Sequence, residues 1–328
     1  MPIRKWEGLK RGENMSDLTP EQFDEILCGD PDELSVHLTE VEKNIKVDGV
    51  SVSIHCHCLT VDANGRVRLA RLAEFMRSAL IDYAIPKSKV EQARQRDAQF
   101  KSGSAMSALH YEAKATFSDL DKSGEGGELL LFLLAERFLK IPQILCKMEL
   151  KTDTRMHYHG ADGVYGRVDT DGILNLYWGE SKLYADATAA IRDCLASLAP
   201  FLIEDDSENA DRERDLVLLS DKADLSDPNL TDALKKYFDK TSPKSNRVRY
   251  GGVALVGFDS NVYPDETSEA VVAEITAAAR FALEGWSKNI KKRLQEEKLD
   301  KVKIEFFCVP VPSVERFRAE FKKALGLT

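Results

Sequence analysis

The stretch from residue 162 to residue 182 restricts the possible fold more than any other part of this sequence. Two apolar and aromatic runs, Val164–Val168 and Ile173–Trp178, are separated by the turn-forming residues Asp169-Thr170-Asp171-Gly172. This order is typical of a β-hairpin. If Gly172 takes the positive φ of a bulged three-residue loop, Asp169 pairs with Ile173, and the register of the whole hairpin follows.

The predicted register decides which polar side chains meet at the open end of the hairpin. It places Asp162 directly opposite Glu180, on the same face of the two strands. Because side chains alternate along a strand, Lys182 shares the face of Glu180, whereas Ser181 is expected to point away. A two-residue turn would instead place Asp162 opposite Ser181 and scatter the cluster.

Two neighbouring carboxylates and a lysine suit metal-dependent phosphodiester cleavage. Carboxylates that lie close together repel each other unless a cation sits between them. Mg²⁺ binds few protein carboxylates, keeps several waters and accepts phosphate oxygens in its remaining positions. A nearby lysine can hold the attacking water and offset the charge that develops on the phosphorane. We therefore expect Asp162 and Glu180 to bind Mg²⁺ or Mn²⁺, and Lys182 to act in catalysis.

The spacing of Asp162, Glu180 and Lys182 resembles that of the PD-(D/E)xK nuclease superfamily, which has the restriction-endonuclease-like fold. Ala161 stands where the superfamily name has proline, a position that tolerates change. The superfamily usually adds a glutamate on a helix before the first strand, and Glu128 is well placed for it. The resemblance implies that Glu128 is a further catalytic residue and metal ligand. An acid near a helix N-terminus can also simply stabilise the helix end.

Further features of the sequence narrow the resemblance. They are Glu128, the predicted strand Ile144–Leu150, Gly160-Ala161-Asp162, Glu180-Ser181-Lys182, the alanine-rich helix that follows, and the tail Pro310–Phe317. Over roughly residues 105–328 the chain resembles the HamA family, the nuclease subunits of the Hachiman anti-phage defence system. The resemblance implies a helicase partner resembling HamB, which would hold the nuclease and feed it DNA. A catalytically inactive subunit of such a complex, which only binds nucleic acid or other proteins, is the alternative.

Composition predicts a cytoplasmic protein with no membrane contact. The chain has 328 residues, of which 43% are hydrophobic and 31% charged, as in soluble globular proteins. No apolar run approaches the roughly 20 residues of a membrane helix, and Met1–Trp6 lacks the apolar core of a signal peptide. The six cysteines are dispersed, which favours reduced core residues over a disulfide framework.

The charge balance argues against a free-standing DNA-binding protein. The net charge is −9 and the pI is about 5.4, whereas affinity for nucleic acid comes largely from basic side chains. Three basic groups are present, and each is better explained as a solvated face than as a DNA contact. They are Arg66 with Arg68 and Arg71, residues 240–249, and residues 288–293.

The order of predicted elements indicates an α/β fold with a mixed central sheet flanked by helices. We expect a restriction-endonuclease-like domain over residues 106–328, preceded by an α+β extension over residues 1–105. This extension, or the long helix predicted near Thr267–Glu296, is a plausible docking surface for the partner. Further strands are expected at residues 49–61, 144–151, 248–258 and 302–309, and the acidic stretch Glu204–Asp215 is expected to form an exposed loop.

Two histidine pairs need separate interpretation. His55-Cys56-His57-Cys58 would place imidazoles on one strand face and thiols on the other, so core residues are favoured over a zinc site. His157-Tyr158-His159 could line the cleft or form a polar loop, and Tyr184 could contact a backbone phosphate or pack. The chain has no P-loop, no dinucleotide glycine motif after a strand and no serine nucleophile elbow, so an NTPase, an oxidoreductase or a serine-nucleophile hydrolase has little support.

Overall fold

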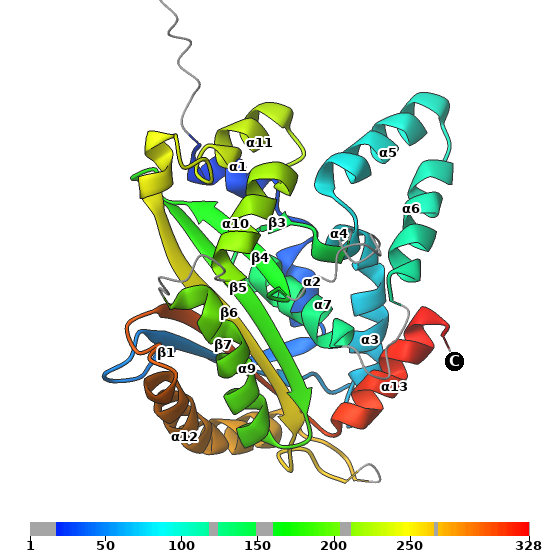
Figure 1. The fold of residues 1–328 in the computed structure, drawn as a ribbon. Coiled ribbons are helices and arrows are strands. Elements are labelled where there is room, and N and C mark those ends of the chain that lie inside the picture. Colours follow the sequence, from blue (N-terminus) through cyan, green and yellow to red (C-terminus); the bar gives the residue numbers. More distant parts are fainter. Residues whose placement is uncertain (1–17, 118–123, 149–159, 204–210, 266–267, 328) are drawn as a thin grey trace, which may run out of the picture.

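The computed structural model describes residues 18–327 except 118–123, 149–159, 204–210 and 266–267. Over these ranges the chain forms a seven-stranded mixed sheet with strand order β1-β2-β7-β6-β5-β4-β3, flanked by helices (Figure 1). This confirms the predicted α/β class. No helix in the described ranges combines the length and the apolar composition that a bilayer crossing requires.

The centre of the sheet is parallel and its edges are antiparallel. Strands β5, β6 and β7 run parallel, and β2 pairs with β7 in the same sense. Their side chains are buried on both faces, as expected for parallel strands covered by helices. The strand bounds are β1 Leu38–Lys46, β2 Val52–Leu59, β3 Gln143–Leu145, β4 Gly163–Val168, β5 Leu174–Tyr184, β6 Val248–Asp259 and β7 Lys303–Val311.

Helices α9 (Ala187–Leu202) and α12 (Val272–Glu296) cover one face of the sheet, and α7 (Glu125–Leu133) and α13 (Val314–Leu325) lie on the other (Figure 1). Trp178 of β5 stacks on Phe201 of α9, whereas Gly179 lies under Leu131 of α7. Even-numbered residues of β5 therefore face α9, and odd-numbered ones face α7.

The remaining helices surround this core. The helices α5 and α6 form an antiparallel arm beside the sheet (Figure 1). A π-helical turn, η1, continues α7 without a break. The bounds are α1 Pro20–Glu25, α2 Pro31–Ser35, α3 Leu69–Ser78, α4 Leu80–Ala84, α5 Lys87–Phe100, α6 Ser104–Ala115, η1 Leu134–Phe138, α10 Asp211–Lys222, α11 Pro228–Lys235 and the 3₁₀ turn η2 Pro243–Arg247.

The predicted hairpin and its register are confirmed. Strand β4 pairs with β5 from Gly163 opposite Gly179 to Val168 opposite Leu174. The amide of Asp169 donates to the Ile173 carbonyl at 3.0 Å, and Gly172 has a φ of +71°. Loop length and strand alternation were thus sufficient to fix this register.

Two predictions next to the hairpin were wrong. The strand predicted over residues 144–151 ends at Leu145, and Lys147 turns its ammonium group inward to Asp215; residues 149–151 lie outside the described ranges. The acidic stretch is not an exposed loop throughout, because α10 begins at Asp211 and Asp215 is only 1% exposed. Counting charges could not reveal that a buried lysine and Trp178 bind this carboxylate.

The first hundred residues contribute to the same sheet as the rest of the chain. Strand β1, which the sequence did not predict, pairs with β2, and β2 pairs with β7. The predicted boundary near residue 105 falls in the first turn of α6, and it stays a prediction about folding units. The buried pair His55 and His57 lies on β2 against Phe138 and Phe307, which confirms the core interpretation. The pair His157 and His159 lies outside the described residues.

Candidate active site at the open edge of strand β5

The candidate site arises because β5 is longer than its antiparallel neighbour. Strand β4 begins only at Gly163, opposite Gly179, whereas β5 continues to Tyr184 alongside β6. Asp162 lies just before β4 and turns its carboxylate to this open edge. Both the amide and the hydroxyl of Ser181 donate to Asp162 Oδ2, at 2.8 Å each. Ser181 lies on the opposite face of β5 from Glu180 and Lys182, as alternation predicts. The expectation that Asp162 lies opposite Glu180 on the same face was wrong, because β4 begins only at Gly163 and Asp162, outside the strand pairing, turns its carboxylate to Ser181.

Glu180 and Lys182 share a face of β5, as alternation requires. Lys182 Nζ lies 2.5 Å from Glu180 Oε1, and the Glu180 side chain is only 6% exposed. Burial raises the pKa of Glu180, although the ammonium group of Lys182 opposes this. Burial would lower the pKa of Lys182, but the Glu180 carboxylate more than offsets it and raises that pKa. The lysine is therefore a firmly charged group held at the open edge.

Glu128 reaches the same edge from the first turn of α7. A Cβ added at Gly127 would lie 2.9 Å from Leu183 Cδ1 and 3.0 Å from Ser181 Oγ, so a larger residue would force these side chains to shift, and glycine allows the close approach of helix and strand. The Tyr83 hydroxyl donates to Glu128 Oε2 at 2.8 Å. The close packing therefore places Glu128 beside the open edge, as expected for a residue turned towards the site.

Like charges gather around Asp162. Burial and then the nearby carboxylates of Glu128 and Glu180 raise the pKa of Asp162 to about 8, although the two donors of Ser181 partly oppose these effects. Repulsion between crowded carboxylates raises their pKa and does not stabilise the fold. Such clusters are therefore common at functional sites, where the chemistry requires them. The structure thus brings Glu128, Asp162, Glu180 and Lys182 together at one edge.

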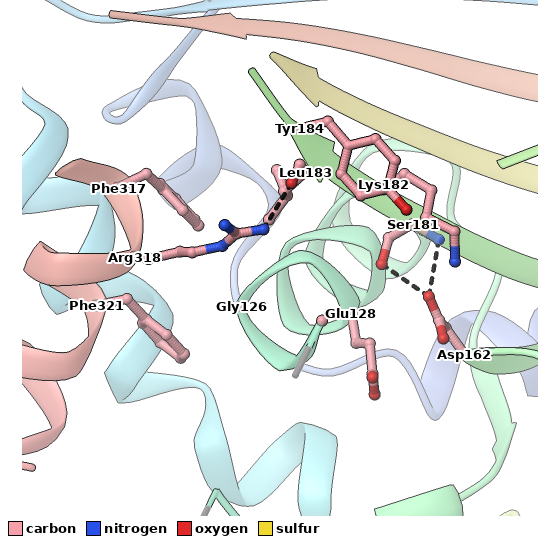
Figure 2. Close-up of a pocket in the computed structure, with 11 residues that line it drawn as sticks. Gly126, Glu128, Asp162, Ser181, Lys182, Leu183, Tyr184, Phe317, Arg318 and Phe321 are labelled. Atoms are coloured by element: carbon pink, nitrogen blue, oxygen red, sulfur yellow. Dashed lines mark hydrogen bonds between the residues drawn. The ribbon is translucent and has the colours of Figure 1, made fainter. Parts of the chain in front are cut away.

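A cavity of about 240 Å³ opens at this edge (Figure 2). Helix α13, at the end of the chain, forms one wall with Phe317, Arg318 and Phe321. The sequence did not indicate that this helix contributes to the site. Glu180 is not among the residues that line the cavity. The others that line it are Gly124, Gly126, Glu128, Asp162, Ser181, Lys182, Leu183 and Tyr184.

The side chains present suit a divalent cation chemically but do not converge on one point. Within the described ranges, no three His, Cys, Asp or Glu side chains lie close enough to hold a metal ion together. Glu128 and Asp162 do line the cavity, and the raised pKa of Asp162 reflects negative charge that a cation would relieve. Mg²⁺ commonly binds one or two protein carboxylates and fills its other positions with water and phosphate. A site based on Glu128 and Asp162 fits that pattern.

A second buried network supports the chain just before Asp162. Lys147 Nζ donates to the Ala161 carbonyl and to Asp215 Oδ2, the latter at 3.2 Å. Trp178 Nε1 donates to the same Asp215 oxygen at 2.9 Å. Burial lowers the pKa of Lys147, and Asp215 opposes this effect. Sequence reasoning missed this network, since no local pattern links residues so far apart in the chain.

Comparison with known protein families gives one match. The HamA family model matches residues 34–325. This range begins well before residue 105, so it includes strands β1 and β2 as well as the site and α13. No curated protein sequence gives a match to the chain.

Proposed function

The chain belongs to the HamA family, which supplies a component of Hachiman anti-phage defence, and on that premise we propose that it is a metal-dependent DNA nuclease. It would hydrolyse phosphodiester bonds as the effector subunit of that system. The observation that carries the proposal is the group formed by buried Glu128 and Glu180, half-buried Asp162 and Lys182 at the open edge of β5, where burial and neighbouring carboxylates raise the pKa of Asp162 to about 8.

The proposed roles follow from the contacts of each side chain. Asp162 and Glu128, with Glu180 as a further ligand, would hold Mg²⁺ or Mn²⁺. When bound, such a cation polarises the phosphate and lowers the pKa of a bound water. Ser181 fixes one oxygen of Asp162 with two donors, which leaves the other oxygen for the cavity. Lys182 carries the positive charge that would orient the attacking water and offset charge on the phosphorane.

The chemistry is tested by incubating the purified protein with linear DNA, circular DNA and RNA in Mg²⁺, Mn²⁺ or EDTA. We expect cleavage of DNA with either metal and none in EDTA. Glu180→Ala should abolish cleavage, whereas Glu284→Ala, which removes an exposed acid from α12, should cleave at the wild-type rate. Absence of cleavage under every condition, with and without partner, would favour the alternative of an inactive nucleic-acid-binding subunit.

We also propose that the protein works with a helicase resembling HamB. A net charge of −9 gives the chain little electrostatic means of finding DNA alone. We therefore expect a stable complex with that helicase and weak activity of the isolated chain. Co-purification of the two proteins and cleavage rates with and without the partner test this. Vigorous cleavage by the isolated chain at physiological salt would contradict the partner requirement but not the chemistry.

A further inference from the structure

The open edge of β5 exposes backbone groups of two residues that β4 does not cover. Ser181 and Leu183 both direct their backbone polar groups to this side, because alternate residues of a strand share an orientation. The Ser181 amide donates to Asp162, and the Leu183 carbonyl accepts from Arg318 Nη2 at 2.7 Å. Asp162 and Arg318, which both line the cavity, therefore bind the uncovered backbone groups on either side of Lys182 (Figure 2).

To bind a phosphodiester, the cavity needs a positive charge that no neighbouring carboxylate already neutralises. A phosphodiester is an anion, and the cavity lining contains the carboxylates Glu128 and Asp162. Lys182 also lines it, but its ammonium group lies 2.5 Å from Glu180 and compensates that acid. Arg318 is the other cation of the lining. Its bond is to a neutral carbonyl, and among the described residues no carboxylate pairs with it.

Arg318 is held in a fixed position relative to the site. Its neighbours on α13, Phe317 and Phe321, are 1% and 2% exposed. A Cβ added at Gly126 would lie 3.3 Å from either ring, so α13 abuts the turn of α7 that carries Glu128. A guanidinium group has five donors in a rigid plane. Because Leu183 takes one of them, the group is oriented and still has donors left for a ligand.

We propose that Arg318 binds a non-bridging oxygen of the substrate phosphodiester, and that α13 is thereby the substrate-binding wall of the cavity. This inference rests on the proposed nuclease function, since it concerns the same cavity. The carboxylates approach the phosphate from the hairpin and α7, and Arg318 approaches from α13. Arg318 is a binding residue in this scheme, so its loss weakens affinity for DNA more than it slows turnover.

The test measures DNA binding without cleavage. Full-length protein is titrated into a fluorescein-labelled oligonucleotide in EDTA at low ionic strength, and anisotropy is recorded. Arg318→Gln should weaken binding about tenfold, as expected for the loss of one charge-assisted contact, and Arg318→Lys should recover part of it. Lys323→Gln, which removes an exposed charge from the same helix, should change binding less than about twofold. Equal losses for the two glutamine variants would overturn the proposal.

A second measurement excludes a merely structural effect on α13. One phosphodiester at a time is replaced by a neutral methylphosphonate, and binding is compared between wild type and Arg318→Gln. One position should weaken wild-type binding about tenfold and leave the variant unchanged. If that penalty persists in the variant, Arg318 does not contact the phosphate. If Arg318-dependent binding is present but no cleavage occurs with metal and partner, the nuclease proposal fails and the binding subsite stands.

Discussion

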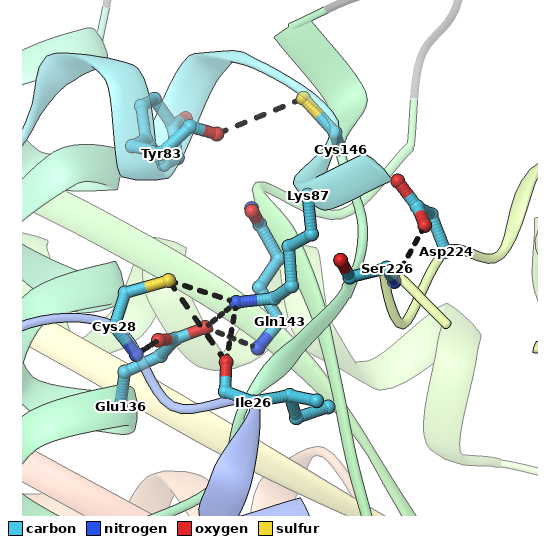
Figure 3. A network of polar contacts seen from close by, with 9 residues as sticks. All are labelled: Ile26, Cys28, Tyr83, Lys87, Glu136, Gln143, Cys146, Asp224 and Ser226. Carbon is cyan, nitrogen blue, oxygen red and sulfur yellow. Dashed lines mark hydrogen bonds and ion pairs between the residues drawn. The ribbon is translucent and has the colours of Figure 1, made fainter. Parts of the chain in front are cut away.

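Glu128 and Glu136 lie on one continuous helical segment, formed by α7 and η1, but the charges around them differ in sign. Glu136 is 1% exposed, and its carboxylate is fully engaged (Figure 3). Its Oε2 accepts from the Cys28 amide at 2.8 Å. Its Oε1 accepts from Lys87 Nζ at 3.0 Å and from the Gln143 amide at 2.8 Å. This acid joins the loop after α1, helix α5 and strand β3 in one neutralised cluster.

Glu128 faces the cavity and has like charge as a neighbour. Its Oε2 accepts from the Tyr83 hydroxyl. Burial is the largest cause that raises the pKa of Asp162 to about 8, and the charge of Glu128 is the next. Removing a buried acid that neutralises a buried lysine destabilises the fold, whereas crowded acids beside a cavity indicate a functional site. For these two glutamates, burial alone does not separate the structural from the functional acid, whereas the sign of the neighbouring charge does.

The largest effect is expected for a substitution that breaks the Glu136 cluster. Glu136→Ala should lower the free energy of unfolding by about 3–5 kcal/mol, because it leaves the Lys87 ammonium buried without its partner. Urea denaturation followed by circular dichroism measures this. Lys87→Met should cost a similar amount, and the double variant should cost less than the sum of the two. A loss below about 1 kcal/mol for Glu136→Ala would contradict the structural role.

Asp162→Asn should impair cleavage without lowering the stability of the fold. Removing a repelling charge should leave the free energy of unfolding unchanged or raise it, since Ser181 can still donate to the amide oxygen. Cleavage should fall about a hundredfold to a thousandfold, as for other groups that hold developing charge or a metal. Denaturation and single-turnover cleavage are measured on the same preparation. Substantial destabilisation with normal cleavage would reverse the assignment of the two clusters.

Lys182→Ala should separate metal binding from turnover. We expect cleavage to fall about a hundredfold, because the ammonium group acts on the water and the transition state. Mg²⁺ binding, measured by titration calorimetry, should be retained, since the carboxylates remain. Loss of metal binding together with turnover would show that Lys182 mainly keeps Glu180 in place.

The smallest effect is expected for Glu128→Gln. The amide keeps the size of the side chain and a hydrogen bond with Tyr83, so stability should change by less than about 1 kcal/mol. Cleavage should fall about tenfold, because the amide oxygen of glutamine can still support the metal or the water. A wild-type rate would remove Glu128 from the site. A loss as large as that of Asp162→Asn would show that the negative charge of Glu128 is as important as that of Asp162.

Local rules were enough for the hairpin, its register and the fold class. Loop length and alternation set the pairing of β4 with β5, because a slip of one residue would turn every side chain to the other face. The same rules brought Asp162, Glu180 and Lys182 to one end of the hairpin. They failed at Asp162, because β4 begins only at Gly163 and the aspartate, outside the strand pairing, turns its carboxylate to Ser181.

The sequence by itself determined the periodic elements and the types of residue that meet at the hairpin's open end, since these depend on neighbours a few positions apart. Only the tertiary structure decided which charges are neutralised. Asp215 meets Trp178 across 37 positions, Glu136 meets Lys87 across 49, and Arg318 meets Leu183 across 135. The free energy of a buried charge depends on every group packed around it. Distant segments supply those groups, so no local pattern records them.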